Sequence, residues 1–380
     1  MKKTVLVIVV LIVLMLCCSP ACAFADVIDD LEQEVSDGID KIDFSKVDEI
    51  GFDFIGSVAD KVKKIISGEY DDAQTFLQLL VSLMSDGLKS LLPELSAIFV
   101  VMVIMGLIRK TSGGLISQGT DDVVSFVGLA VVLMSVLSLI VRSYRQVYEL
   151  LFKVGTIAEV SMPILLTLIL ANGGNTISSV CQPSMIMFST VVIKVVQNII
   201  MPLSIFALIF AIVSNFSSNV KVGKMSSFLT SSSTWILGIV FMIYSAFTSV
   251  QGISAMAIDG VSFRAAKFAT KSYIPILGGY LADGFDMVVA STSLIKNAFG
   301  AVTLLILLLT VAQPLISILC VNLGLQGVAA ICEPIVDEKY VRVLGGVSKT
   351  LTFLAVLICA VAFMLCILVL IAITCANGVL

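Results

Sequence analysis

The stretch LTFLAVLICAVAFMLCILVLIAITCA, residues 351–376, decides the fold of this chain. It contains no charged side chain and no proline, and it is longer than the roughly 20 apolar residues that a helix needs to cross a bilayer. Inside lipid every backbone polar group must be paired within the protein, so a run of this kind predicts a membrane-spanning helix.

The composition of the whole chain also indicates a membrane protein. Apolar residues make up 58% of the 380 positions, charged residues 13%, and the mean hydropathy is +1.10. Soluble domains contain about 45–50% apolar and about 25% charged residues. Similar apolar runs predict further spans at 95–108, 123–141, 226–250 and 301–323.

Two other segments are ambiguous. Residues 142–170 begin amphipathic and end apolar, which predicts entry into the membrane near residue 156. Residues 177–215 are too long for one span, and Pro202 predicts a break, giving either a hairpin or two broken segments. We therefore expect residues 93–380 to form an all-α, polytopic membrane domain with about six to eight membrane segments.

The first 25 residues have the pattern of a secretory signal peptide. Two lysines precede an apolar core, and small residues lead to a predicted cleavage after Ala25. The alternative is an uncleaved first membrane helix. Either interpretation places the following residues outside the cytoplasm, and the positive pair Arg109-Lys110 after the 95–108 span agrees with that orientation.

Residues 26–92 are predicted to be a small, acidic, extracytoplasmic helical segment. Between residues 26 and 72 there are fifteen acidic and five basic side chains, a balance of −10. Apolar residues recur at steps of four and form one narrow stripe on a helix. This stripe needs a partner, either the membrane domain or another protein. It consists of Val27, Leu31, Val35 and Ile39.

A basic patch lies in the middle of the apolar chain. Arg264, Lys267 and Lys271 are spaced i, i+3, i+7, which places them on one stripe of a helix. Asp259-Gly260 predicts a turn before that helix, and Tyr273-Ile274-Pro275 predicts its end. Two interpretations of 249–300 stay open. It is either a partly re-entrant segment beside a water-filled cavity, or a basic helix lying on lipid headgroups.

Other charged residues are also candidates for a polar path. Lys194 lies inside 177–215 and is predicted either to line a polar cavity, for example paired with Glu159, or to reach an interface near Gln197-Asn198. Asp283 and Asp286 share a helix face, and are predicted either to line an ion or solute path or to be solvated at the interface. Candidate pore or partner-contact residues are Asp259, Arg264, Lys267, Lys271, Asp283, Asp286, Lys296 and Lys194.

The sequence argues against an enzyme. Histidine is absent, which excludes histidine-dependent triads and His-type zinc sites. The nine cysteines form no CxxC pair; three lie in the N-terminal leader, and the other six lie in or beside apolar runs and are predicted to be buried hydrophobes, with no metal site. GGVSKT (345–350) resembles the end of a phosphate-binding loop, but Val343 and Ser348 stand where that loop needs glycine. We predict no catalytic residues and no cofactor.

Four short motifs carry a resemblance to a known family. SVQG (249–252), DGVSFRAAKF (259–268), YIP (273–275) and SLIKNAFG (293–300) resemble the stage III sporulation protein AE family of endospore-forming bacteria. The likeness extends over roughly residues 95–376. It implies a non-enzymatic subunit of the stage III A-operon apparatus in the mother-cell membrane around the forespore.

The resemblance also implies partners. They are the other proteins of that operon, including an ATPase, and indirectly the forespore membrane protein stage III Q across the intermembrane space. The chain would then be a pore or export-gate component of a channel or feeding apparatus, in a homo- or hetero-oligomer within the lipid bilayer. A non-conducting scaffold of the same complex and a small-solute permease are the alternatives, and no nucleic-acid partner is expected.

Overall fold

The computed structural model describes Lys89 and residues 91–108, 118–171, 182–216, 222–273 and 278–375. Between 252 and 288 it describes the course of the helices and few side chains. The predicted signal peptide and most of the acidic segment lie outside the described residues. The described helices are Leu91–Ile108, α6 (Gln118–Ala171), α7 (Gln182–Val195), the π-helix η2 (Val196–Ile200), α8 (Met201–Phe216), α9 (Gly223–Tyr273), α10 (Gly278–Cys332) and α11 (Glu338–Cys375).

The described part of the chain is helical, and six of its helical stretches are long and apolar enough to cross a membrane. The predicted all-α class is thereby confirmed for the described residues, and six such helices agree with a multi-pass membrane protein. Each of these stretches satisfies its backbone hydrogen bonds internally, which is the condition for crossing lipid.

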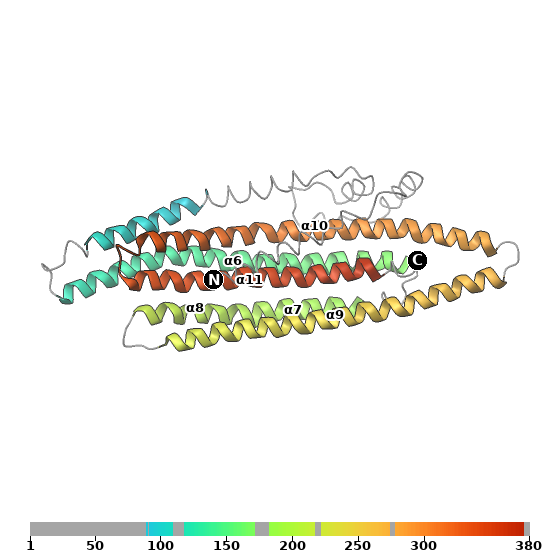
Figure 1. Ribbon diagram of the computed structural model, residues 1–380, viewed down its shortest axis with the longest axis horizontal. Coiled ribbons are helices and arrows are strands. Elements are labelled where there is room, and N and C mark those ends of the chain that lie inside the picture. The colour runs from blue at the N-terminus through green and yellow to red at the C-terminus, as the bar shows by residue number, and fades with distance from the viewer. Residues whose placement is uncertain are drawn as a thin grey trace.

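The helices run side by side along the long axis of the molecule (Figure 1). α11 lies at the centre, because it contacts α6, α7, α8, α9 and α10. α10 and α6 pack closely on it and on each other, and α8 and α9 form a second closely packed pair. The apolar part of α11 is also the most buried of the six spans. Its charge-free sequence therefore serves helix packing as well as contact with lipid.

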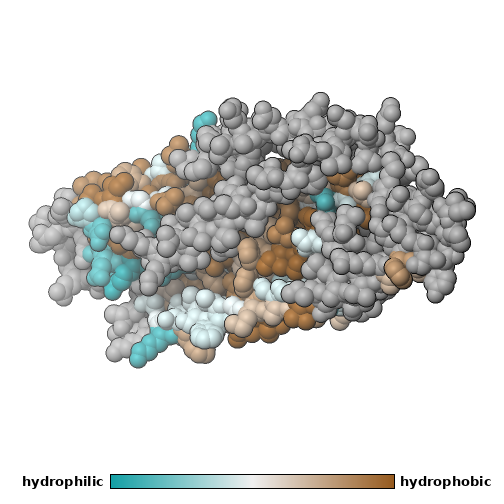
Figure 2. Space-filling view, turned by 45° about the vertical axis from the view of Figure 1, so that its right-hand side comes forward, coloured by the Kyte–Doolittle hydropathy of each residue, from teal (hydrophilic) through white to brown (hydrophobic). Residues whose placement is uncertain are grey.

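Large apolar side chains also cover the outside of the bundle. Met134 is 74% exposed, Trp235 72% and Met187 70%. Figure 2 shows this apolar surface over several described helices, with hydrophilic atoms gathered toward the left-hand end. A soluble monomer rarely exposes so much apolar surface, whereas lipid chains are a suitable neighbour for it.

α6 differs from the prediction. Residues 142–170 do not enter the membrane separately, because they continue the helix of the 123–141 span without a break. Arg142 and Arg145 are exposed while Val147 and Leu150 are buried. Exposed and buried residues therefore keep alternating with the period of a helix through the charged region. At 1.5 Å per residue the 54 residues of α6 extend for about 81 Å, well beyond the roughly 30 Å of a hydrocarbon core.

The break predicted at Pro202 is a local change of helix type. α7, η2 and α8 form one continuous helical run, and no hairpin forms between 182 and 216. The π-helical residues Val196–Ile200 end directly before Met201 and Pro202, and the Met201 N–H donates to the Val196 carbonyl. Proline lacks an N–H and clashes with the carbonyl four residues earlier, so a wider turn at this point accommodates it without ending the helix.

The basic patch also sits in a longer helix than predicted. Asp259-Gly260 forms no turn, since α9 runs through it from Gly223 to Tyr273. The end at Tyr273 was predicted correctly, and the chain resumes helical structure at Gly278. The residue before a proline is pushed away from helical angles, which explains why α9 stops just short of Pro275.

Candidate functional site

The family-like region 249–300 forms the end of α9 and the beginning of α10. In Figure 1 the end of α9 and the beginning of α10 both extend beyond the C-terminal end of α11, and they are consecutive in the chain, so we describe them as a helical hairpin. We call residues 252–295 the α9–α10 hairpin. α9 contains Asp259, Arg264, Lys267 and Lys271, and the first turns of α10 contain Asp283 and Asp286. The side chains of these six residues lie outside the described part of the chain.

Lys296 anchors the base of this hairpin. Its side chain is fully buried, and its Nζ donates a hydrogen bond of 2.7 Å to the carbonyl oxygen of Ile373. α11 ends at Cys375, so Ile373 contributes one of the last four carbonyls, which have no partner inside the helix. The ammonium group therefore satisfies an open carbonyl at the negative end of the α11 dipole.

Gly300 lies one turn further along α10 and brings the two helices together. A Cβ atom at this position would overlap the side chain of Ile373, the residue whose carbonyl Lys296 binds. Ser293, Lys296, Gly300 and Thr303 are spaced i, i+3, i+7, i+10, and the three side chains among them are buried. They make one polar face of α10 inside an apolar bundle.

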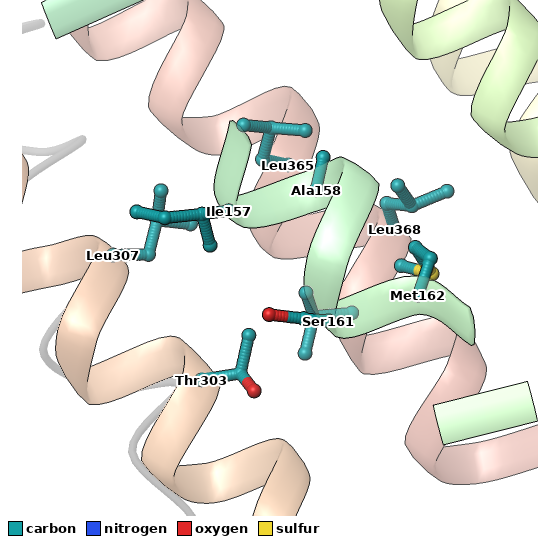
Figure 3. Close-up of a pocket in the computed structure, with 9 residues that line it drawn as sticks. Ile157, Ala158, Ser161, Met162, Thr303, Leu307, Leu365 and Leu368 are labelled. Atoms are coloured by element: carbon teal, nitrogen blue, oxygen red, sulfur yellow. The ribbon is translucent and has the colours of Figure 1, made fainter. Parts of the chain in front are cut away.

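A small cavity lies at the inner end of this polar face, between α6, α10 and α11 (Figure 3). Its volume is about 10 Å³, close to the minimum that holds one water molecule. Ser161 of α6 and Thr303 of α10 face each other across it, and Leu365 and Leu368 of α11 also line it. The Thr303 hydroxyl donates to the Phe299 carbonyl, whereas the buried Ser161 hydroxyl has no hydrogen-bond partner among the described residues. The cavity is too small to pass a solute.

The predicted pairing of Lys194 with Glu159 is not observed among the described residues. Both side chains are exposed, Lys194 on α7 and Glu159 on α6, and no ion pair joins them. Lys194 lies directly before η2, which contains Gln197 and Asn198. The alternative, that Lys194 reaches an interface near Gln197-Asn198, stays a prediction.

A polar network that was not predicted from the sequence joins α10 and α11. Asn322 donates to Thr352 at 3.0 Å and accepts from Ser348 at 2.7 Å and from Gln326 at 3.2 Å. Gln326 also donates to Ser348 at 2.8 Å. The signal was present in the sequence, because Asn322 and Gln326 are amides four residues apart at the end of an apolar run. We call these four residues the Asn322 network.

Two buried tyrosines connect further helices around η2. Tyr144 of α6 donates to Ser204 of α8 at 3.1 Å, and the Tyr244 hydroxyl of α9 lies 3.3 Å from that of Ser189 on α7. Phe188 stacks on the Tyr244 ring. In each tyrosine the hydroxyl group lies against a serine hydroxyl, and the apolar ring packs in the core. These contacts fix the position of the helices on either side of the π turn.

Comparison with known proteins identifies the family. A sequence profile of stage III sporulation protein AE matches residues 57–378. The chain belongs to that family. A curated relative called stage III sporulation protein AE, from Bacillus subtilis (strain 168), is 30% identical over 216 residues, which are 57% of this chain and 54% of the relative. The alignment thus spans about half of the relative's length. No solved structure matches the chain.

The resemblance stated from the four short motifs is confirmed. The stage III sporulation protein AE match contains the α9–α10 hairpin, Lys296 and the Asn322 network. The chain is therefore a sporulation protein with a multi-pass arrangement of apolar helices. None of the hydrogen-bonded groups described above resembles a catalytic centre, and the described residues hold no group of three metal-ligating side chains.

Proposed function

We propose that the chain is an integral membrane subunit of the stage III A sporulation apparatus, and that its α9–α10 hairpin forms part of a pore or export gate. The membrane would be that of the mother cell around the forespore. The observation that supports this proposal most is the hairpin itself. It contains most of the residues of the motifs that resemble the family, and it has six charged residues. Its two helices also extend beyond the end of α11.

The charges of the hairpin require a polar environment. A charged side chain at the centre of a bilayer costs about 2.5–3.5 kcal/mol on the insertion scale unless it is paired or solvated. Arg264, Lys267 and Lys271 share one stripe of α9, so an oligomer could place several such stripes around water. Lys296 and Gly300 would hold the base of the hairpin on α11.

The passage in this proposal lies between subunits. The cavity between α6, α10 and α11 is about 10 Å³ and takes one water molecule at most, so a conduit through this packed contact is not favoured. Partner subunits are therefore part of the proposal: the other stage III A proteins, among them an ATPase, and indirectly stage III Q on the forespore side.

Charge reversal tests the gate. We expect Arg264→Glu, Lys267→Glu and Lys271→Glu together to abolish spore maturation while the protein still accumulates in the membrane. The matched control is Arg264→Lys, Lys267→Arg and Lys271→Arg, which keeps the charges and should sporulate normally. Normal sporulation of the charge-reversed protein would remove the hairpin stripe from the mechanism.

The second candidate is a non-conducting scaffold, and the tightly packed bundle favours it. In this alternative the hairpin contacts other subunits and passes nothing. Solute flux or conductance through liposomes containing the purified complex separates the two candidates. A pore component should give flux that charge reversal of the hairpin changes, whereas a scaffold should give none with either protein.

A further inference from the structure

The middle of α6 carries a charged stripe on its outer face. Arg142, Arg145, Glu149 and Lys153 are spaced i, i+3, i+7, i+11, and all four side chains are exposed. The opposite face of the same turns is buried in the core. It consists of Val147, Leu150, Leu151 and Val154. We call the four exposed residues the α6 charged stripe.

Within the described part of the chain the stripe is only partly paired. Arg142 contacts Glu94 at 3.2 Å, and both side chains keep much of their exposure. Arg145, Glu149 and Lys153 make no hydrogen bond or ion pair. The stripe has a net positive charge, and such charges are costly against lipid chains unless water or an acidic group lies beside them.

Aromatic side chains border the stripe. Tyr148 is 52% exposed and Phe152 69% exposed, both on the side of Arg145. A partner that fits this surface therefore presents acidic groups together with an apolar stripe, as an acidic amphipathic helix does.

The chain itself contains such a segment. Residues 26–72 have fifteen acidic and five basic side chains, and Val27, Leu31, Val35 and Ile39 recur at the spacing of a helical stripe. This segment precedes the helix Leu91–Ile108, whose Glu94 already contacts Arg142. It therefore joins the bundle next to the α6 charged stripe.

We propose that residues 26–72 dock back on the α6 charged stripe of the same chain. The acidic side chains pair with Arg145 and Lys153, and the apolar stripe covers Tyr148 and Phe152. Along α6, Lys153 lies 11 residues beyond Arg142, about 17 Å, which the 18 residues between 72 and 91 can readily span. A short tether also gives an effective concentration of about millimolar, so a weak contact is sufficient.

Site-specific photo-crosslinking in the membrane-embedded, full-length protein tests the docking. A photoreactive amino acid at Tyr148 should form intramolecular adducts with residues 26–72, identified by peptide mass spectrometry. Met134 is the matched control, since it is 74% exposed on the same side of α6 but lies in the charge-free part. Tyr148 adducts to lipid, to a second copy or to another protein, with none to residues 26–72, would overturn the proposal.

Charge changes test the specificity of the same adduct. Arg145→Glu with Lys153→Glu should lower its yield about threefold to tenfold, as expected for two exposed ion pairs. Adding Asp30→Lys and Glu34→Lys should restore it, while Lys349→Glu, an exposed cation on α11, should leave it unchanged. An unchanged yield in the α6 double variant, or an equal loss with Lys349→Glu, would contradict docking on this stripe.

Discussion

Lys296 occupies a fully buried position, where a lysine is rarely found without a partner. Its hydrogen bond to the Ile373 carbonyl connects the base of the α9–α10 hairpin to the end of α11. Ser161, by contrast, is buried with an unpartnered hydroxyl beside a cavity of one-water size. At this scale the polar atoms inside the bundle serve to fix helix positions.

Replacing Lys296 with methionine should lower stability. The change keeps most of the side-chain volume but removes the donor to Ile373, and losing a hydrogen bond to a charged group costs about 1.5–3 kcal/mol. The measurement is the midpoint of denaturing-detergent unfolding in mixed micelles. Lys349→Met on the exposed face of α11 is the control and should change stability by about 0.5 kcal/mol or less. A higher midpoint for Lys296→Met would mean that burying the ammonium costs more than its hydrogen bond contributes.

At the scale of the helices, α10 and α11 are joined by the Asn322 network. Asn322→Leu removes three hydrogen bonds and leaves Thr352 without its partner across the contact, while Ser348 keeps only its bond from Gln326. Interhelical hydrogen bonds in membranes average about 0.6 kcal/mol and reach about 1.7 kcal/mol, so we expect a loss of about 1–2 kcal/mol.

Detergent unfolding of the Asn322→Leu protein measures this loss. Leu323→Ala is the matched control, because Leu323 is the next residue of α10 and is 66% exposed. Equal effects of the two changes would indicate that the network adds nothing beyond helix propensity and side-chain size.

The sequence predicted which segments are helical better than it predicted the residues at which the helices begin and end. The 351–376 run and the other apolar stretches predicted the all-α fold class, and Pro275 predicted the end of α9 at Tyr273. The continuity of α6 was missed because Arg142 and Arg145 interrupt the hydropathy without interrupting the helical period. The contact of Lys296 with Ile373 joins residues 77 positions apart, and no local pattern encodes a pairing of that kind.

The described part of the molecule is a bundle whose central helix is α11 and whose outer face is apolar over much of its surface. α6, α9 and α10 each contain more than 50 residues and exceed the hydrocarbon thickness of one bilayer. Parts of these helices must therefore lie outside the hydrocarbon, where the α6 charged stripe and the α9–α10 hairpin would meet water or other protein segments.

Trp235, the only tryptophan of the chain, reports where lipid contacts the bundle. It is 72% exposed on α9, within the apolar stretch Gly223–Gln251, so its indole should lie among lipid chains. We expect its fluorescence in reconstituted vesicles to be quenched by phospholipids with brominated chains and little affected by aqueous iodide. A Trp235→Phe, Phe353→Trp protein is the control, because Phe353 is buried and should escape both quenchers. Quenching of Trp235 by iodide alone would place this face of α9 in water, and the bundle would then need another surface against the membrane.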